Sequence, residues 1–470
     1  MLEKPFVEIF TMSDEHYIYD VNTNTISKIS ADLYNLLNSG LKKCSTGVAD
    51  EIRELRSHGL LEENPLQTII HPATKFLTSY FEHCSTITLQ MTQMCNFKCR
   101  YCGFASATEM ERSHNNELMD WDTAKASLDF LHDHSKDESN ITIGFYGGEP
   151  LLNYNTILKC VKYAEDIFAD KNRLYLITTN GSIINNDIVK MFNDYNFSVM
   201  VSLDGPQVLN DKNRRFLKNG EGTFGKVFNN INVLKASLES PSTKLEINCV
   251  IDPEEDMGKY LDFFNNNSLF NGVAVNYSLL DSSHLKYNAI PDKRFIVEEK
   301  KETTRKYIRI LLEENSEDLE STKDSIIKLY KSFQPTKRLP TKGCPAGVCI
   351  PGYVKLYIKT NGDILPCEKV SEISECMRLG NVFDGFDIQK VKSFINIGAL
   401  TSEDCRRCSA IRHCSICPRD IDGIDEFDVS YKKYLCRFSR KDFHNSLLRY
   451  VSLERCGILD AVVNKFEDIG

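Results

Sequence analysis

Three cysteines lie close together in the first quarter of the chain, at Cys95, Cys99 and Cys102. Three thiolates in one short loop can bind three of the four irons of a [4Fe–4S] cluster. No fourth cysteine lies in this loop, so one iron would stay open to a small ligand, as in catalytic metal sites. A zinc site completed by His114 is the alternative, but three such close thiolates suit a cluster better.

Eight further cysteines have the spacing of metal ligands. They are Cys344, Cys349, Cys367, Cys405, Cys408, Cys414, Cys417 and Cys436. Because a reducing cytosol does not favour disulfides, clustered cysteines there indicate metal ligands or catalysts. Eight thiolates suit two four-sulfur sites, and by spacing alone these are iron–sulfur clusters or zinc sites. The other six of the 17 cysteines are scattered and fit buried free thiols.

The composition is that of a globular protein with more than one domain. The chain has 470 residues, of which 41% are hydrophobic and 26% are charged, so two or three domains are expected. Its net charge of -9 does not favour non-specific binding of nucleic acid. No apolar run is long enough to span a bilayer, and the N-terminus lacks the pattern of a signal peptide. We therefore expect a cytoplasmic protein that does not bind a membrane.

The segment that must position the first cysteines, residues 85–290, alternates apolar strands with helical stretches. The predicted strands are 86–91, 141–146, 174–178, 197–203, 245–251 and 273–277, and the helices include 121–134 and 226–239. Six such repeats predict a parallel sheet with right-handed crossovers and a barrel-like α/β fold. In such folds the loops after the strands carry the chemistry, and Cys95 follows the first strand.

The flanking segments differ in composition from this core. Residues 1–65 read as short strands followed by two short helices, which suggests a winged-helix-like module, and residues 66–84 read as a linker. Residues 291–340 predict a charged helical bridge. Residues 341–440 are rich in cysteine and turns, with a hairpin at Asn361-Gly362, and residues 441–470 predict a C-terminal helix.

The three-cysteine loop, Cys95-Asn-Phe-Lys-Cys-Arg-Tyr-Cys102, resembles the signature of the radical SAM superfamily, whose members cleave S-adenosylmethionine (SAM) reductively. Gly147-Gly-Glu-Pro150, Thr178-Thr-Asn-Gly181, Ser202-Leu-Asp-Gly-Pro206 and Asp211-Lys-Asn-Arg214 follow in the family's order. The resemblance implies a partial (β/α)6 barrel in which Glu149 accepts hydrogen bonds from the SAM ammonium and Arg214 meets its carboxylate. The full set of implied SAM-binding residues is Tyr101, Gly147, Gly148, Glu149, Pro150, Thr179, Asn180, Ser202 and Arg214.

The eight-cysteine segment resembles the SPASM extension of radical SAM enzymes, which holds two auxiliary [4Fe–4S] clusters. The resemblance assigns Cys344, Cys349, Cys367 and Cys417 to the first cluster, and Cys405, Cys408, Cys414 and Cys436 to the second. Glu368 matches an aspartate that acts as the base in anaerobic sulfatase maturases, so it is a candidate catalytic base facing the barrel mouth. A solvated surface carboxylate is the alternative for Glu368.

The N-terminal module has no basic stripe along its second helix, which disfavours a DNA-binding regulator. It resembles the element with which maturases of ribosomally made peptides bind a leader peptide as an added strand. Together these resemblances imply a radical SAM/SPASM maturase that forms thioether crosslinks, as in sactipeptide and ranthipeptide pathways. Its cofactors would be SAM and three [4Fe–4S] clusters, and its partners a precursor peptide and a flavodoxin- or ferredoxin-type electron donor.

Three other functions stay open on the sequence. They are carbon–carbon crosslinking of a peptide, sulfatase maturation to formylglycine, and a non-enzymatic zinc-binding scaffold. A basic run around Cys436 consists of Lys432, Lys433, Arg437, Arg440 and Lys441. It is either a solvated face or a surface that steers an acidic peptide or an electron-donor protein.

Overall fold

The computed structural model describes residues 4–39, 45–102, 115–238, 244–280, 316–353 and 355–466. His114 and the part of the predicted helical bridge before residue 316 lie outside these ranges. None of the described helices is both long enough and apolar enough to cross a membrane.

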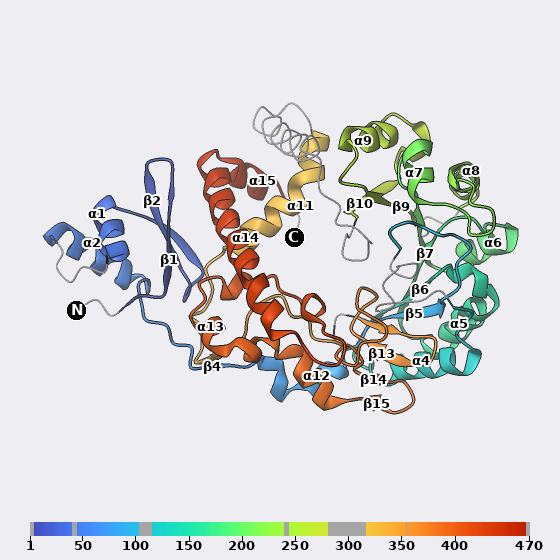
Figure 1. Cartoon of the computed structure of the whole chain (residues 1–470), viewed down its shortest axis with the longest axis horizontal. Coiled ribbons are helices and arrows are strands. Elements are labelled where there is room, and N and C mark those ends of the chain that lie inside the picture. The colour runs from blue at the N-terminus through green and yellow to red at the C-terminus, as the bar shows by residue number, and fades with distance from the viewer. Residues whose placement is uncertain are drawn as a thin grey trace.

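Six parallel strands, consecutive in the chain, form the centre of the right-hand lobe in Figure 1. They are β5 (Thr86–Thr92), β6 (Asn140–Gly147), β7 (Asn172–Thr179), β8 (Phe197–Ser202), β9 (Lys244–Ile251) and β10 (Ala274–Leu279). Each pairs in parallel with the next. The predicted strands and the barrel-like α/β fold are therefore confirmed.

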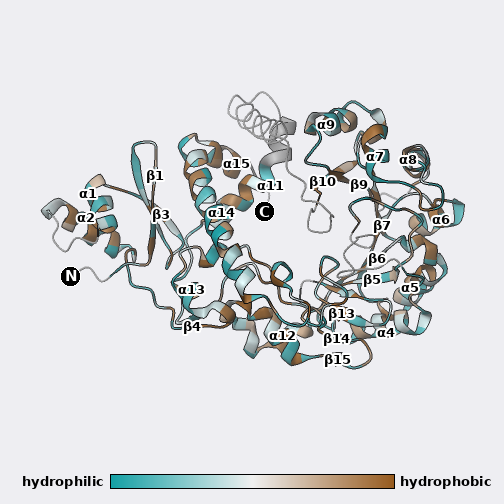
Figure 2. Ribbon diagram, in the orientation of Figure 1, coloured by the Kyte–Doolittle hydropathy of each residue, from teal (hydrophilic) through white to brown (hydrophobic). Residues whose placement is uncertain are grey.

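Helices cover the outer side of these strands (Figure 1). They are α4 (Trp121–Asp133), α5 (Tyr154–Ile167), α6 (Asn186–Asp194), α7 (Gln207–Asn213), α8 (Phe224–Ser237) and α9 (Met257–Asn265). Alternate strand residues such as Ile87 and Leu89 are fully buried in one cluster with helix residues such as Leu128, because strand side chains alternate between the two faces. Figure 2 shows hydrophobic residues along these strands, as their burial requires.

The C-terminal segment extends the same sheet. Strand β12 (Leu356–Ile358) pairs in parallel with β5, and β13 (Asp363–Leu365) returns antiparallel to it. Gly362 forms the tight turn between them with φ of +85°, which confirms the predicted hairpin. Two short strands complete the sheet, β14 (Gly380–Asn381) and β15 (Gly385–Phe386). Two short helices follow, α12 (Ile388–Ile395) and α13 (Ser402–Arg406).

The N-terminal module lies at the far left of Figure 1. It consists of the antiparallel strands β1 (Val7–Met12), β2 (Glu15–Asp20) and β3 (Thr25–Ile29), followed by α1 (Ala31–Ser39) and α2 (Thr46–Ser57). Ile18 of β2 packs with the two helices. Tyr17 and Tyr19 face the other way, into a cluster shared with the C-terminal helices. These helices are α11 (Ser316–Ser332), α14 (Val429–Arg455) and α15 (Ile458–Phe466).

Two predicted boundaries differ from the structure. Residues 66–84 are not a free linker, because β4 (Thr68–Ile69) pairs with β11 (Lys342–Gly343) and the helix α3 (Leu77–Phe81) buries Leu77 and Phe81 in the barrel core. The predicted boundary at residue 440 falls inside α14, which continues unbroken to Arg455. Residues 66–84 were interpreted as a linker because of nearby turn-forming prolines. The boundary at residue 440 was set by the last cysteine of the series, Cys436, and not by the end of the helix.

Candidate active site

The three-cysteine loop begins just after the C-terminal end of β5. The Cys95 sulfur accepts hydrogen bonds from the Phe97 backbone amide at 3.4 Å and from Asn180 Nδ2 at 3.8 Å. Burial raises the pKa of Cys95 to about 12, and the nearby Cys102 adds to this rise. Burial also raises the pKa of Cys99, with Cys102 again contributing. The structure therefore brings the three predicted thiols together at the C-terminal edge of the sheet.

Two glycines let the end of β6 pack directly on this loop. A Cβ at Gly147, whose φ is +129°, would lie 2.2 Å from the Thr92 carbonyl oxygen, and a Cβ at Gly148 would lie 2.0 Å from that of Met94. The Gly148 amide donates to the Thr92 carbonyl at 2.8 Å. A side chain at either glycine would therefore clash with the backbone at the end of β5 and the start of the loop, and their contact with SAM stays a prediction.

Glu149, which the resemblance assigns to the SAM ammonium, is completely buried. Its carboxylate accepts hydrogen bonds from Thr179 Oγ1 at 2.7 Å, from the Asn180 amide at 2.7 Å and from the Leu151 amide at 3.1 Å. Burial raises the pKa of Glu149 to about 7, although these three donors oppose the rise. Glu149 therefore joins the ends of β6 and β7, and its contact with SAM stays a prediction.

The end of β7 is joined to the cysteine loop by amide side chains. Asn180 Nδ2 donates to Asn96 Oδ1 at 2.8 Å, and Asn96 Nδ2 donates to Ser182 Oγ at 2.8 Å. Asn180 also reaches the Cys95 sulfur. Pro150 and Ser202 are both buried nearby, at the ends of β6 and β8. Sequence reasoning missed Ser182, whose position directly after the Thr-Asn-Gly motif was the available signal.

A buried ion pair between Asp204 and Arg214 contacts the loop through Tyr101. Asp204 was not among the site residues predicted from the sequence. Asp204 is fully buried, and its Oδ2 accepts from Arg214 Nε at 2.8 Å and from the Tyr101 hydroxyl. Its Oδ1 accepts from the Val250 amide at 3.0 Å. The Tyr101 ring lies 5.5 Å from the Arg214 guanidinium. Because Asp204 is the acid of the Ser-Leu-Asp-Gly-Pro motif, its place in that motif could have identified it.

The loop's residues fit an iron–sulfur cluster with an open iron. Burial keeps the Cys95 and Cys99 thiols protonated at neutral pH unless a metal cation compensates the thiolate charge. Asn213 Oδ1, next to Arg214, is a buried acceptor without a hydrogen-bond partner among the described residues, as a missing donor group would leave it.

The first predicted thiol group of the C-terminal segment is partly assembled. Desolvation raises the pKa of Cys349 to about 11, and the nearby Cys417 and Cys367 add to this rise. Cys344 has its pKa raised by desolvation alone. The structure therefore brings Cys349, Cys367 and Cys417 together, while Cys344 shows no such influence of another thiol.

The second group, Cys405, Cys408, Cys414 and Cys436, lines one cavity of about 210 Å³. Lys432 is 2% exposed, and its Nζ contacts Thr401 Oγ1 and lies 3.7 Å from the Cys405 sulfur. The Thr401 hydroxyl itself lies 3.3 Å from that sulfur. A buried ammonium costs free energy unless negative charge faces it, so Lys432 fits a site that carries thiolates or a cluster.

Glu368 lies at the opposite end of the strands from the Cys95 loop. Its carboxylate forms a two-point ion pair with Lys355 Nζ at 2.8 and 2.9 Å. Leu356, the residue after Lys355, is paired with Ile87 near the start of β5. Burial disfavours ionisation of Glu368, but Lys355 outweighs it and lowers the Glu368 pKa. Because β12 runs parallel to β5, Glu368 lies level with the start of β5, and its role as a base at the barrel mouth stays a prediction.

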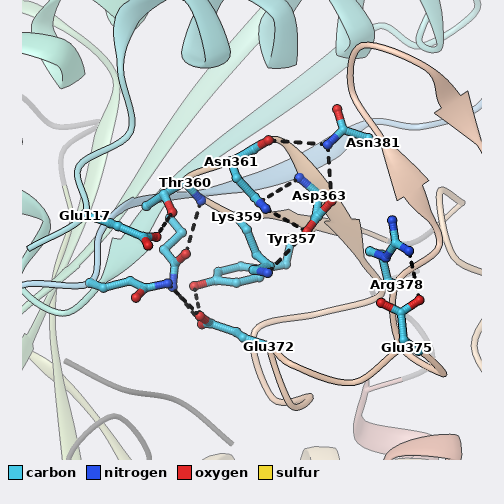
Figure 3. Close-up of polar contacts among 12 residues, drawn as sticks. Glu117, Tyr357, Lys359, Thr360, Asn361, Asp363, Glu372, Glu375, Arg378 and Asn381 are labelled. Atoms are coloured by element: carbon cyan, nitrogen blue, oxygen red, sulfur yellow. Dashed lines mark hydrogen bonds and ion pairs between the residues drawn. The ribbon is translucent and has the colours of Figure 1, made fainter. Parts of the chain in front are cut away.

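A buried polar network joins the C-terminal segment to the barrel at the Cys95 end (Figure 3). Glu372 is 5% exposed and accepts from Gln90 Nε2 at 2.7 Å and from the Tyr357 hydroxyl at 3.4 Å. Thr360 Oγ1 donates to Glu117 Oε2 at 2.9 Å. These contacts fix the β12–β13 hairpin against β5, so the barrel and the cysteine-rich segment form one continuous sheet.

Comparison with known proteins identifies the core. Residues 89–264 match the Radical SAM superfamily. An uncharacterised protein of Methanocaldococcus jannaschii is 33% identical over 37% of this chain, and a cysteine-type anaerobic sulfatase-maturating enzyme of Clostridium novyi is 30% identical over 36%. A radical SAM cyclopropyl synthase, TigE, of Paramaledivibacter caminithermalis is 26% identical over 42%. The matches span 58%, 43% and 40% of those proteins.

The fold is shared with a solved structure, native anSMEcpe with bound AdoMet. The TM-score is 0.55 at 18% identity, over 78% of this chain and 98% of that one. At this identity the likeness shows the fold. With the cysteine loop, the two glycines and the strand-end residues arranged in the superfamily's order, the chain contains a radical SAM domain in residues 89–264.

Proposed function

We propose that the protein is a maturase that installs thioether crosslinks in a ribosomally made peptide, from a cysteine sulfur to a carbon of another residue. The observation that carries the proposal is the placement of two thiol groups at opposite ends of the strands. Cys95 follows the end of β5, whereas Cys367 lies beside its start, through β12 and β13. A peptide held along the inner face of the sheet would lie between them.

SAM bound at an open iron supplies, when reduced by one electron, methionine and a 5′-deoxyadenosyl radical that removes a hydrogen atom from a substrate. Asp204, Arg214 and Glu149 would hold the loop and the strand ends in the geometry that this step needs. A thioether requires the loss of two hydrogens from the peptide. One leaves as the abstracted atom, and the other leaves as the thiol proton and one electron. Cys349, Cys367 and Cys417 would hold a cluster able to accept this electron.

Glu368 is the proposed acceptor of the thiol proton. Its side chain is 22% exposed and lies directly after Cys367 in the chain. Lys355 keeps the Glu368 carboxylate ionised and therefore able to accept a proton. The same ion pair lowers the basicity of Glu368. A cluster held by Cys349, Cys367 and Cys417 would offset this, because a nearby metal ion makes a thiol more acidic.

The N-terminal module is the proposed site of the leader peptide. In the described part of the chain, β3 pairs with β2 alone, so its outer edge is open to an added strand. Deletion of residues 1–65 is a poor test, because Tyr17 and Tyr19 pack on the C-terminal helices and Arg412 donates to the Val21 carbonyl at 2.7 Å. Hydrogen–deuterium exchange of the full chain should instead show slower exchange in β3, and not in β1, when the precursor is added. Equal protection of both strands, or of neither, would contradict leader binding at this edge.

Mass spectrometry of a precursor peptide after reaction with SAM and reductant tests the reaction. The peptide encoded by a short cysteine-containing reading frame beside the gene is the first substrate to use. Each thioether should remove two hydrogens and protect one cysteine from alkylation. An unchanged peptide mass despite SAM consumption would contradict the proposal.

Two alternatives are favoured by relatives and give other outcomes. The similarity to sulfatase-maturating enzymes supports formylglycine formation, in which a cysteine becomes an aldehyde. The similarity to a cyclopropyl synthase supports carbon–carbon bond formation, in which two hydrogens are lost but every cysteine still alkylates. A colourless protein without iron would support the zinc scaffold instead.

Iron analysis tests the cluster assignment separately. Eleven cysteines in three groups imply about twelve irons per anaerobically prepared chain. Replacement of Cys95, Cys99 and Cys102 by alanine should remove about a third of this iron and all SAM cleavage. Continued 5′-deoxyadenosine formation by this variant would overturn the role of the loop.

A further inference from the structure

Three aromatic side chains are exposed along one face of α14. Tyr431, Tyr434 and Phe438 are 47%, 49% and 48% exposed. Tyr431 stacks on Tyr434 with ring centroids 5.7 Å apart, and Phe438 meets Tyr434 edge-on at 5.1 Å. Their spacing of three and four residues places them on the same side of the helix. Contiguous exposed aromatic surface of this kind is typical of protein–protein contacts.

Four exposed cations lie around these rings, although the whole chain carries a net charge of -9. They are Lys433, Arg437, Arg440 and Lys441. None forms a salt bridge with another residue in the described ranges, whereas lysines elsewhere, such as Lys125 and Lys190, pair with acids on their own helices. An aromatic patch ringed by unpaired positive charge suits an acidic protein surface.

The second thiol group lies next to this face. Cys436 is on α14 itself, between Tyr434 and Phe438, and Lys433, Arg437 and Arg440 help to line the cavity of the four thiols. The face therefore places a partner directly beside the proposed second cluster. An acidic substrate peptide has no comparable reason to bind here, because Cys95 and Cys367 belong to the barrel sheet and not to α14.

We propose that Tyr431, Tyr434 and Phe438, with the cations around them, form the docking face for a small acidic one-electron carrier protein of the flavodoxin or ferredoxin class. The inference rests on the proposed function, because reductive SAM cleavage consumes one electron. In each transfer the carrier is oxidised by one electron, and that electron is consumed when one carbon–sulfur bond of SAM breaks. The four-thiol site beneath the face is the point of entry.

The test is the binding of a reduced acidic flavodoxin to the iron-loaded full chain without any peptide, measured against salt concentration. Arg437→Glu with Lys441→Glu should weaken binding at least tenfold and flatten its salt dependence. Tyr434→Ala with Phe438→Ala should weaken it without changing the salt slope. Lys162→Glu with Lys226→Glu, a matched charge reversal of exposed lysines on α5 and α8, should bind as the unaltered protein does.

Dithionite separates this proposal from the proposed function, because it delivers electrons without docking. The Tyr434→Ala, Phe438→Ala variant, whose altered side chains do not line the cavity of the four thiols, should retain its iron and its dithionite-driven SAM cleavage within twofold, and lose only the flavodoxin-driven rate. Unchanged flavodoxin binding by this variant would overturn the proposal, as would failure of the unaltered protein to bind both flavodoxin and ferredoxin. If the variant cleaves SAM with dithionite but no longer modifies the precursor, the face binds peptide and the assignment to a carrier is wrong. Absence of dithionite-driven cleavage in the unaltered protein would instead overturn the proposed function.

Discussion

The Cys95 loop and the second thiol group, Cys405, Cys408, Cys414 and Cys436, hold their thiols in opposite surroundings. At the loop, the Cys95 sulfur is held by neutral donors, and Arg214, which acts on Cys99, is 6% exposed and already paired with Asp204. At the second group, a buried lysine faces Cys405 and exposed cations surround the cavity. A site that generates a radical needs isolation from solvent, whereas a site that exchanges electrons with a partner protein needs an accessible surface.

The two thiol groups also differ in which parts of the chain hold them in place. The loop is held by the ends of β6, β7 and β8, which belong to one barrel. The second group is held by contacts with other parts of the chain, since His413 Nε2 lies 2.9 Å from Asn24 Oδ1 and Ser409 Oγ donates to Glu8 Oε2 at 2.6 Å. The first region should therefore respond most to loss of its own contacts, and the second to the state of the N-terminal module.

The largest effect is expected at Asp204. Asp204→Asn removes the anion that faces the buried Arg214, and loss of one member of a buried ion pair costs about 3–5 kcal/mol. Chemical denaturation should show this loss, together with weaker SAM binding. Asp252→Asn is the matched control, because its partner Lys212 is 32% exposed and also pairs with Glu255. Equal losses in both variants would show that the loop has no special dependence on Asp204.

Acidification should lower the stability of the second region. Burial lowers the pKa of His413 to about 4, with Arg412 contributing. Between about pH 4 and the ordinary value near 6.5, the folded state binds fewer protons than the unfolded state, so stability rises with pH and is lost on acidification. The contribution is at most about 3 kcal/mol and is complete above pH 6.5. Denaturation at several pH values should show a shallower slope for His413→Gln, and an unchanged slope would refute this assignment.

Gly148→Ala tests how tightly the first region is packed. The added Cβ would lie 2.0 Å from the Met94 carbonyl oxygen, so the backbone must move at a cost of about 1–3 kcal/mol. Gly225→Ala in α8 has nothing within 4 Å of its Cβ and should be neutral or slightly stabilising. We expect reduced iron content and SAM binding for Gly148→Ala alone. Unimpaired SAM binding by that variant would show that the loop tolerates displacement.

The smallest effect is expected from Lys432→Met. Loss of the ammonium beside Cys405 removes positive charge that stabilises the more negative, reduced state of a cluster there. Its midpoint potential, measured by redox titration with EPR detection, should fall by about 50 mV, the equivalent of about 1 kcal/mol for one electron. Lys433→Met is the control on the exposed side. Equal shifts in the two variants would mean that burial of Lys432 has no influence.

Local patterns in the sequence predicted most of the barrel. The period-two strands, the turn at Asn361-Gly362 and the order of the strand-end motifs need only neighbouring residues to be recognised. Asp204 was not predicted as a site residue, because its contact with Arg214 depends on how the chain folds back through α7. The contact of Gln90 with Glu372 joins residues 282 positions apart, and no spacing rule predicts it. The same holds for the parallel pairing of β12 with β5, which places Glu368 near the start of β5.

The central claim is that a peptide supplies the hydrogen removed by the SAM-derived radical. Deuterium transfer tests it most directly, with a fully deuterated precursor peptide, unlabelled SAM and the iron-loaded protein. Mass spectrometry should then find one deuterium in each 5′-deoxyadenosine formed, in proportion to modified peptide. Formation of 5′-deoxyadenosine without deuterium, at a rate that the peptide does not change, would contradict the account.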